Sequence, residues 1–227
     1  MRCSLRAGLV FYFVVSGGGH IFGQNAKQRA ENFEAFTHAK QLTGTMVQAL
    51  NALRCDAAGH AAAHAISRML AYRPEQRLTM EQVVQHPFFW SPDASVRYVG
   101  ELWNTLDSAP GLRERIDEGG TATLRGDWRT RLPAAFWAQS ARGSFLKGDG
   151  STNHYGPSVS DLVRLVRNLS QHFADQRPEV RRAISHPATG EEIRTAQQQQ
   201  RAVGDFFFAP RRFPQLVVHL WRCRGLL

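Results

Sequence analysis

The sequence predicts an all-α protein. Apolar residues recur every three or four positions along residues 96–109 and 159–173, which is the spacing of one helix face. Thr79 and Ser158 stand where residues that cap helix N-termini are expected, and no strand-rich region is evident. The 227 residues, 43% hydrophobic and 21% charged, are enough for one large domain or two small ones.

The first predicted helix covers residues 4–15 and ends at the glycine cluster 17–19. Two interpretations are open for its apolar run, Ala7–Val15. It is a buried helix of a domain core, or it is part of a signal peptide, because arginines precede the run and small residues follow it. The run is too short to span a bilayer.

The next segments continue the helical pattern. Residues 26–41 form a short polar helix or an irregular loop, and the Ala-rich residues 43–72 are helix-forming. Thr79 with Gln82 three residues later is a capping-box signature, and the helix it opens must stop before Pro87.

A second unit is expected from Ser91, beginning with the helix at 96–109. A glycine-rich loop at 143–157 precedes another helix, which Ser158 opens and in which Asp161 fits a capping box.

Three further helices complete the prediction. A short helix lies between Pro178 and Pro187, residues 195–202 form an exposed helix or an insertion, and residues 213–224 form an apolar terminal helix.

The net charge of +9, from 28 Lys and Arg against 19 Asp and Glu, favours a polyanionic partner such as nucleic acid or an anionic membrane surface. Cys3, Cys55 and Cys223 are far apart and form no C-x-x-C motif, so neither a disulfide framework nor a zinc ribbon is supported. This cysteine usage is typical of a reducing compartment.

The helix opened by Ser158 carries a polar group of special interest: Arg167, Asn168 and His172. Asn168 and His172 are four residues apart, so in a helix they lie one above the other, opposite the apolar stripe. One interpretation is an ordinary solvated face. The other is a phosphodiester site in which histidine moves a proton, arginine supplies a planar fork for phosphate and asparagine donates a hydrogen bond. Such a site needs a second acid or base, and Tyr155, with His154 beside it, is in the preceding loop.

Residues 67–90, SRMLAYRPEQRLTMEQVVQHPFFW, resemble the last helices of a protein kinase large lobe. Arg77 matches the kinase arginine that pairs with the glutamate of the A-P-E segment. Residues 9–23, LVFYFVVSGGGHIFG, resemble the central helix of that lobe and the turn after it. This resemblance favours a buried helix over a signal peptide at the N-terminus.

Three motifs lie beyond Trp90: GDWR at 126–129, S-V-x-D-L-x-x-x-x-R-N-x-x-x-H at 158–172 and FP-x-L at 213–216. With them, this part of the chain is similar to the kinase-extension nuclease (KEN) domain. Two families carry this domain: the stress sensors of the endoplasmic reticulum (the Ire family) and ribonuclease L. The resemblance implies that residues 1–90 are a remnant of a kinase large lobe and that residues 91–227 form an endoribonuclease domain.

The resemblance also implies roles for residues. His172 matches the family's general acid and Tyr155 its general base, with His154 as the alternative if the loop register differs. Arg167 and Asn168 match the residues that hold the phosphate. The implied reaction cuts loops of structured RNA without a metal, by attack of the 2′-hydroxyl, and leaves a 2′,3′-cyclic phosphate.

The family's glycine-rich loop, strand lysine, H-R-D and D-F-G are not in this sequence. The ATP and magnesium site of the full-length family is therefore missing, and neither a bound cofactor nor Ser/Thr kinase activity is expected of this chain. The run SGGGH at 16–20 lacks the G-K-[ST] of a P-loop and is interpreted as a turn.

The expected partners are a messenger RNA stem-loop and a second copy or a longer family member. No membrane segment is expected in this chain, which is predicted to be cytoplasmic, with a longer parent at the cytosolic face of the endoplasmic reticulum. The alternative function is a catalytically weak pseudokinase–KEN fragment that acts as a dimerisation or regulatory module.

Two other groups are given structural roles. Trp128 and Trp137 are predicted to be core residues, although tryptophan can also stack on bases. His60 and His64 are four apart, but no glutamate or cysteine completes a zinc set beside them.

Overall fold

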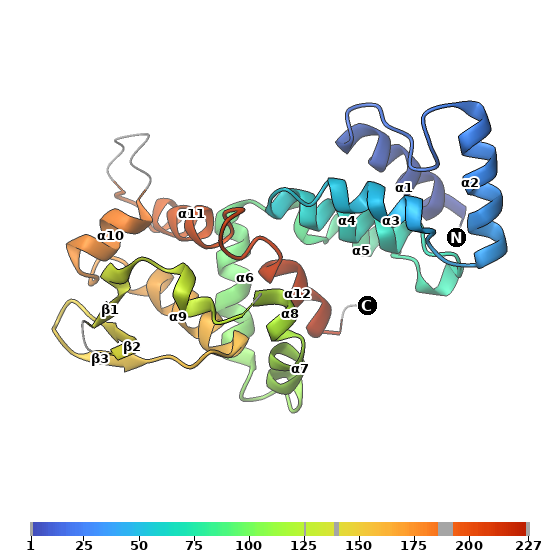
Figure 1. Ribbon diagram of the computed structural model, residues 1–227. Coiled ribbons are helices and arrows are strands. Elements are labelled where there is room, and N and C mark those ends of the chain that lie inside the picture. Colours follow the sequence, from blue (N-terminus) through green and yellow to red (C-terminus); the bar gives the residue numbers. More distant parts are fainter. Residues whose placement is uncertain (1, 125, 139–140, 186–192, 226–227) are drawn as a thin grey trace. The chain divides into compact units, whose positions relative to one another are not determined.

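The computed structural model describes residues 2–124, 126–138, 141–185 and 193–225. The chain divides into two compact units, the first ending at Phe89 and the second running from Trp90 to Gly225 (Figure 1). Both are built mainly of helices, which confirms the all-α prediction.

The first unit contains only helices among its described residues. They are α1 (Arg2–Val15), α2 (Ala26–Ala39), α3 (Gly44–Ala52), α4 (Ala57–Met69), η1 (Pro74–Gln76), α5 (Met80–Val84) and η2 (Pro87–Phe89). The predicted capping box is confirmed at α5, where Thr79 accepts from the backbone of Gln82 and the Gln82 side chain accepts from the backbone of Thr79. Arg77 donates to the backbone carbonyls of Ala71 and Tyr72.

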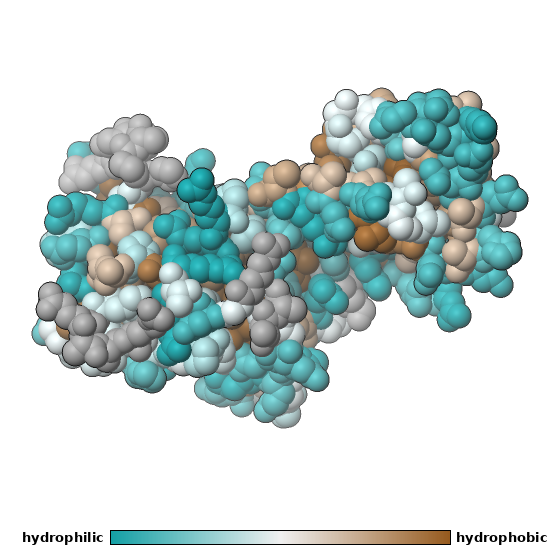
Figure 2. Space-filling model, in the orientation of Figure 1, coloured by the Kyte–Doolittle hydropathy of each residue, from teal (hydrophilic) through white to brown (hydrophobic). Residues whose placement is uncertain are grey.

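Helix α1 lies against α4 at Gly8, where an added Cβ would come within 2.9 Å of the Cβ of Met69. The helix is present as predicted, but the expectation that it is buried is wrong for one of its faces. Val10, Phe13 and Val14 are exposed because α4 covers only the opposite side. Figure 2 shows hydrophobic residues at the surface of this unit among hydrophilic ones.

The second unit combines helices with a small sheet. The elements are α6 (Pro92–Thr105), α7 (Leu112–Glu118), α8 (Gly120–Leu124), η3 (Trp128–Arg131), η4 (Ala134–Phe136), β1 (Trp137–Ala138), β2 (Ala141–Leu146), β3 (Thr152–His154), α9 (Val159–Gln171), α10 (Pro178–Ile184), α11 (Ala196–Phe207) and α12 (Leu216–Cys223). Helix α6 packs against both α9 and α11. Gly204 of α11 allows the close contact with α6, since a Cβ there would lie 2.6 Å from the carbonyl oxygen of Pro92. Pro187, expected after α10, is outside the described residues.

The sheet is antiparallel in the order β1-β2-β3, with Ser144 paired to His154 and Leu146 to Thr152. It occupies much of the segment that the sequence predicts as a glycine-rich loop. Its strands are short and interrupted by glycine, so they carry too little alternation to be recognised from sequence. The β2–β3 hairpin matters because Tyr155 comes directly after it.

Among the described residues, no helix is both long and apolar enough to cross a membrane.

Candidate active site

Helix α9 is anchored at its N-terminus. Ser158 accepts from the backbone N–H of Asp161, as predicted, but the reciprocal half of the capping box is replaced by a bond from the Ser158 hydroxyl to the Asp161 carboxylate. Trp128 donates its indole N–H to the Ser158 carbonyl at 3.0 Å, and Asp117 accepts from the backbone and hydroxyl of Ser160. Buried Trp128 is the core residue that was predicted. These bonds fix where α9 begins, and so where its other end lies.

The predicted apolar stripe of α9 is confirmed. Its members are buried: Leu162, Val163, Val166, Leu169 and Phe173. Arg167 and Asn168 are half-buried and His172 is exposed, with a side chain 59% accessible. The polar face is therefore only partly open to solvent, because the β2–β3 hairpin lies along part of it.

Tyr155 is held by the hairpin rather than by α9. Its backbone N–H donates to the carbonyl of Gly143 at 2.8 Å, and its own carbonyl accepts from Arg129 at 3.3 Å. Gly143 has φ +93°, and a Cβ there would lie 2.8 Å from the carbonyl oxygen of Tyr155. Glycine is therefore suited to this position, where two backbone segments approach closely. The Tyr155 ring meets Phe145 edge to face, and the residue is only 1% exposed.

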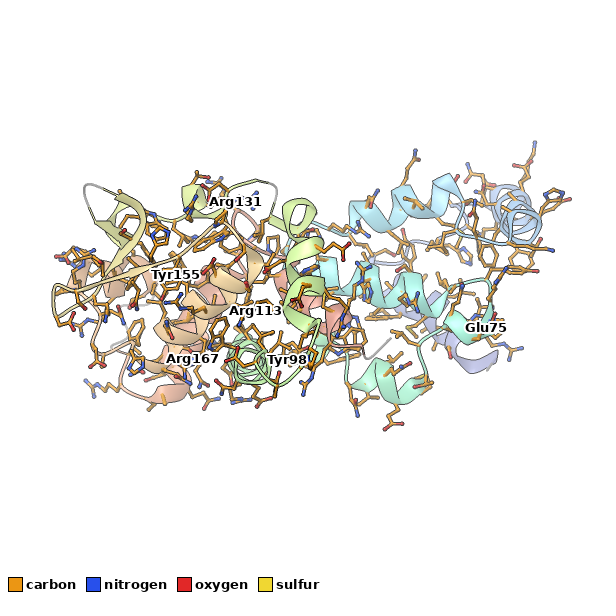
Figure 3. All side chains as sticks on the ribbon, turned by 90° about the horizontal axis from the view of Figure 1, so that it is seen from below. Glu75, Tyr98, Arg113, Arg131, Tyr155 and Arg167 are labelled. Carbon is orange, nitrogen blue, oxygen red and sulfur yellow. The ribbon has the colours of Figure 1, made fainter. Side chains whose placement is uncertain are left out.

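A chain of hydrogen bonds connects Tyr155 to α9. Arg167 Nη1 donates to Asn168 Oδ1 at 3.0 Å, and Asn168 Nδ2 donates to the Tyr155 phenol oxygen at 2.9 Å. Figure 3 labels Tyr155 and Arg167 in this unit. Arg167 also carries a buried Nε with no hydrogen-bond partner among the described residues. The adjacent arginine and asparagine thus orient the phenol from the helix.

His172 lies at the C-terminal end of α9, where its backbone N–H donates to the carbonyl of Asn168 at 3.0 Å. Its Nδ1 lies 3.5 Å from Oδ2 of Asp175, and its carbonyl accepts from the Gln176 side chain at 2.6 Å. With Nδ1 directed to Asp175, Nε2 is the nitrogen available to a ligand.

Tyr155, Asn168 and His172 line one pocket of about 530 Å³, called here the phenol pocket. Its complete lining is Phe145, Lys147, Gly148, Asp149, Asn153, Tyr155, Leu165, Asn168, Leu169, His172, Asp175 and Gln176. Arg167 does not line it and reaches it through Asn168. His154 is exposed and is not part of the lining either.

The proton on Tyr155 is governed by opposing effects. Burial raises the pKa of the phenol above its usual 10, while the hydrogen bond from Asn168 and the charge of Arg164 lower this pKa. Arg164 lies over the ring, with Cζ 4.8 Å from the centroid. Since the net direction is upward, the phenol is neutral near pH 7 and can donate a hydrogen bond into the pocket.

The sequence interpretation missed several lining residues. Lys147 adds a positive charge from the turn of the hairpin, and Asp175 and Gln176 come from the turn after α9. Asp175 stands three residues after His172, a spacing that would have suggested a partner for the imidazole. No local signal marks Lys147, because its position depends on how the hairpin folds over α9.

No three His, Cys, Asp or Glu side chains among the described residues are grouped so that they could hold a metal ion. In the first unit His64 pairs instead with His86, with Nδ1 of the former 2.9 Å from Nε2 of the latter.

Comparison with known proteins identifies a matching family model and several relatives of this chain. Residues 101–225 match the model of the family described as Ribonuclease 2-5A. A human protein named serine/threonine-protein kinase/endoribonuclease IRE2 is 28% identical over 95% of this chain and 20% of its own length. The Caenorhabditis elegans serine/threonine-protein kinase/endoribonuclease ire-1 is 25% identical over 95% of this chain and 19% of its own length.

A Schizosaccharomyces pombe protein named sensor for unfolded proteins in the ER ire1 is 24% identical over 78% of this chain and 15% of its own length. The chain therefore spans between 15% and 20% of the length of these three curated relatives.

Proposed function

Because the chain belongs to the ribonuclease 2-5A family, whose model matches residues 101–225, we propose that it is an endoribonuclease that cuts loops of structured RNA. The 2′-hydroxyl attacks the adjacent phosphate and the 5′-oxygen leaves, which yields a 2′,3′-cyclic phosphate without a metal. Single-stranded loops suit this chemistry, since their bases and backbone can rearrange for in-line attack. The observation that carries the proposal is that Tyr155, Asn168 and His172, from two separate segments, line one pocket.

His172 is proposed as the general acid that protonates the leaving 5′-oxygen. Its exposed imidazole has Nε2 free of the Asp175 contact, and an imidazole can carry a proton near neutral pH. Asp175 would keep the ring oriented with a proton on Nδ1.

Tyr155 is proposed as the group that takes the proton of the 2′-hydroxyl. Its phenol must first release its own proton to solvent, and Asn168, held by Arg167, stabilises the phenolate that results. The bond from Asn168 and the cation of Arg164 both favour the ionised phenol, although burial opposes it. Asn168, held by Arg167, and Lys147 supply donors and charge for the phosphate oxygens.

We also propose that residues 1–90 are the remnant of a kinase large lobe and residues 91–227 the nuclease domain. The names of the human and nematode relatives combine both activities, and the ribonuclease model matches only within the second unit. A role in the response to unfolded proteins in the endoplasmic reticulum is proposed from the name of the S. pombe relative, and a cytosolic location for this chain is proposed with it.

The central test incubates the chain with a stem-loop RNA in EDTA and determines the ends of the products by mass spectrometry. Cleavage with 2′,3′-cyclic phosphate ends is expected. His172→Ala should abolish it, whereas the matched variant His154→Ala, which alters an exposed histidine outside the pocket, should cut like the wild type. Loss of cleavage on chelation would contradict the metal-free mechanism, and full activity of His172→Ala would remove that residue from the chemistry.

Pairing with a second copy, or with a longer family member, is proposed as the active state. If it is, the specific activity should rise with protein concentration and then level off as dimers form. A specific activity independent of concentration, with a monomer in sedimentation experiments, would contradict this.

A further inference from the structure

A second pocket of about 330 Å³ lies in the nuclease unit and shares no lining residue with the phenol pocket. It is formed by the end of α8, the end of η3 and the loop before α12. Its lining includes Arg131, Arg211 and Arg212 together with Thr123 and Gln215, and contains no carboxylate among the described residues. It is called here the arginine pocket.

Two of these arginines make contacts that orient them in the pocket. Arg131 Nη1 donates to the carbonyl of Arg212 at 2.8 Å, and its Cζ lies 5.7 Å from the centroid of the Phe213 ring. Arg212 Nη1 donates to the carbonyl of Phe206 at 2.9 Å, with Cζ 3.5 Å from the centroid of that ring. Carbonyls and ring faces orient a guanidinium, but they do not neutralise its charge.

The described lining of the pocket holds three arginines and no carboxylate. Burial lowers the pKa of Arg212, which means that the cation loses hydration there. Arg211 is exposed and forms no ion pair with a described residue. A guanidinium has five N–H donors, so the bond that holds Arg212 leaves others for a ligand. Clustered guanidinium groups without carboxylates suit an anion with several oxygens, such as phosphate.

We propose that the arginine pocket binds a phosphate group of the RNA backbone away from the bond that is cut, which rests on the ribonuclease function proposed above. The RNA is favoured because η3 contacts a lining residue of the phenol pocket and itself lines the arginine pocket. Arg129 in this helix contacts the carbonyl of Tyr155, and Arg131, two residues later, lines the arginine pocket. Figure 3 shows Arg131 near the upper edge of the unit that also holds Tyr155. An RNA strand carries a phosphate at every nucleotide, so one strand offers phosphates to both pockets.

The test measures binding of a stem-loop RNA that carries 2′-O-methyl groups throughout, so that it cannot be cut, to the full chain at several salt concentrations. The variant is Arg211→Gln, which removes an exposed charge without breaking a described hydrogen bond. The matched control is Arg54→Gln, which removes an exposed charge from the first unit. A second measurement records thermal unfolding with inorganic phosphate as the probe.

Arg211→Gln should bind this RNA several-fold more weakly, and the slope of log affinity against log salt should shrink by about 0.7, as for the loss of one contact to a single strand. Arg54→Gln should keep the slope of the wild type. Cleavage of a dinucleotide, whose single internucleotide phosphate cannot fill both pockets, should be the same in all three proteins.

Equal slopes for Arg211→Gln and the wild type would overturn the proposal. A second result would also overturn it: inorganic phosphate stabilises the wild type but not Arg211→Gln, while the two proteins bind the RNA equally. The pocket would then bind a free phosphate compound and not the RNA. If instead the proposed ribonuclease function is wrong, the result is different: the wild type binds the methylated RNA but leaves the unmodified RNA intact.

Discussion

Asn168 donates its side-chain amide to the phenol oxygen of Tyr155 across 2.9 Å, and the other end of the same amide accepts from Arg167 at 3.0 Å. Both ends are thereby used, so the amide cannot rotate without losing both bonds. The position of a phenol on the hairpin therefore depends on two adjacent residues of α9.

Replacing Asn168 with alanine should raise the pKa of Tyr155 still further. The amide N–H stabilises the phenolate and so lowers this pKa, while burial raises it; without the amide, only the charge of Arg164 and the weaker contributions oppose burial. The ¹³C-tyrosine NMR signal of Tyr155, recorded as a function of pH, measures the change. Asn104→Ala, at an exposed position of α6, is the control. A lower pKa in Asn168→Ala would show that the phenolate is stabilised by other groups.

Arg167→Lys should lower kcat/KM for RNA cleavage about 10- to 100-fold, although the charge is kept. Lysine cannot reproduce the planar fork that holds Asn168 Oδ1, so the amide and the phenol lose their orientation. Steady-state cleavage of a stem-loop RNA measures the effect, and Arg182→Lys, an exposed residue of α10, is the matched control. Equal kcat/KM for Arg167→Lys and the wild type would mean that only the charge matters.

Gly148→Ala should separate the two halves of the phenol pocket. A Cβ at this turn residue would lie 2.1 Å from the carbonyl oxygen of Asp175, so the hairpin with Tyr155 must move away from the turn after His172. A misplacement of about 1 Å can cost roughly 100-fold in rate.

The control for this variant is Gly150→Ala in the same turn. Its Cβ would meet no atom within 4 Å, although its φ of +83° adds backbone strain. Thermal unfolding and RNA cleavage are measured for both variants. Cleavage by Gly148→Ala that equals cleavage by Gly150→Ala would show that this close approach does not set the pocket's geometry.

Acid should destabilise the first unit through His86. Phe88 donates its backbone N–H to His86 Nδ1 at 3.1 Å, so the proton of the neutral ring is on Nε2, which lies 2.9 Å from His64 Nδ1. Burial lowers the pKa of His86 to about 4, against about 6.5 for histidine in an unfolded chain. The folded state therefore prefers the neutral ring. Its contribution is complete above about pH 6.5 and is lost as the pH falls to about 4.

Each pKa unit corresponds to about 1.4 kcal/mol, so the free energy of unfolding should fall by at most about 3 kcal/mol over this range from His86 alone. Urea unfolding, monitored by far-UV circular dichroism at several pH values, measures it. His86→Gln should show a shallower dependence on pH below 6.5. An equal dependence in both proteins would assign the effect to other groups.

Local patterns determine much of this molecule. The 3.6-residue period placed the buried stripe of α9 and brought Asn168 and His172 to its opposite side, and the caps at Thr79 and Ser158 marked two helix starts. These features depend on residues a few positions apart, so a single stretch of sequence contains all the information that they need.

Other features required the fold. The sheet was missed, α1 is exposed along one face, and Lys147 and Gln176 were not recognised as lining residues. Each of these features depends on which distant segment packs beside the residues concerned. One example is the hairpin turn, where Gly148 lies against the backbone of Asp175. Local periodicity orients a side chain relative to its own helix, whereas a pocket exists only where long-range packing brings a second segment opposite it.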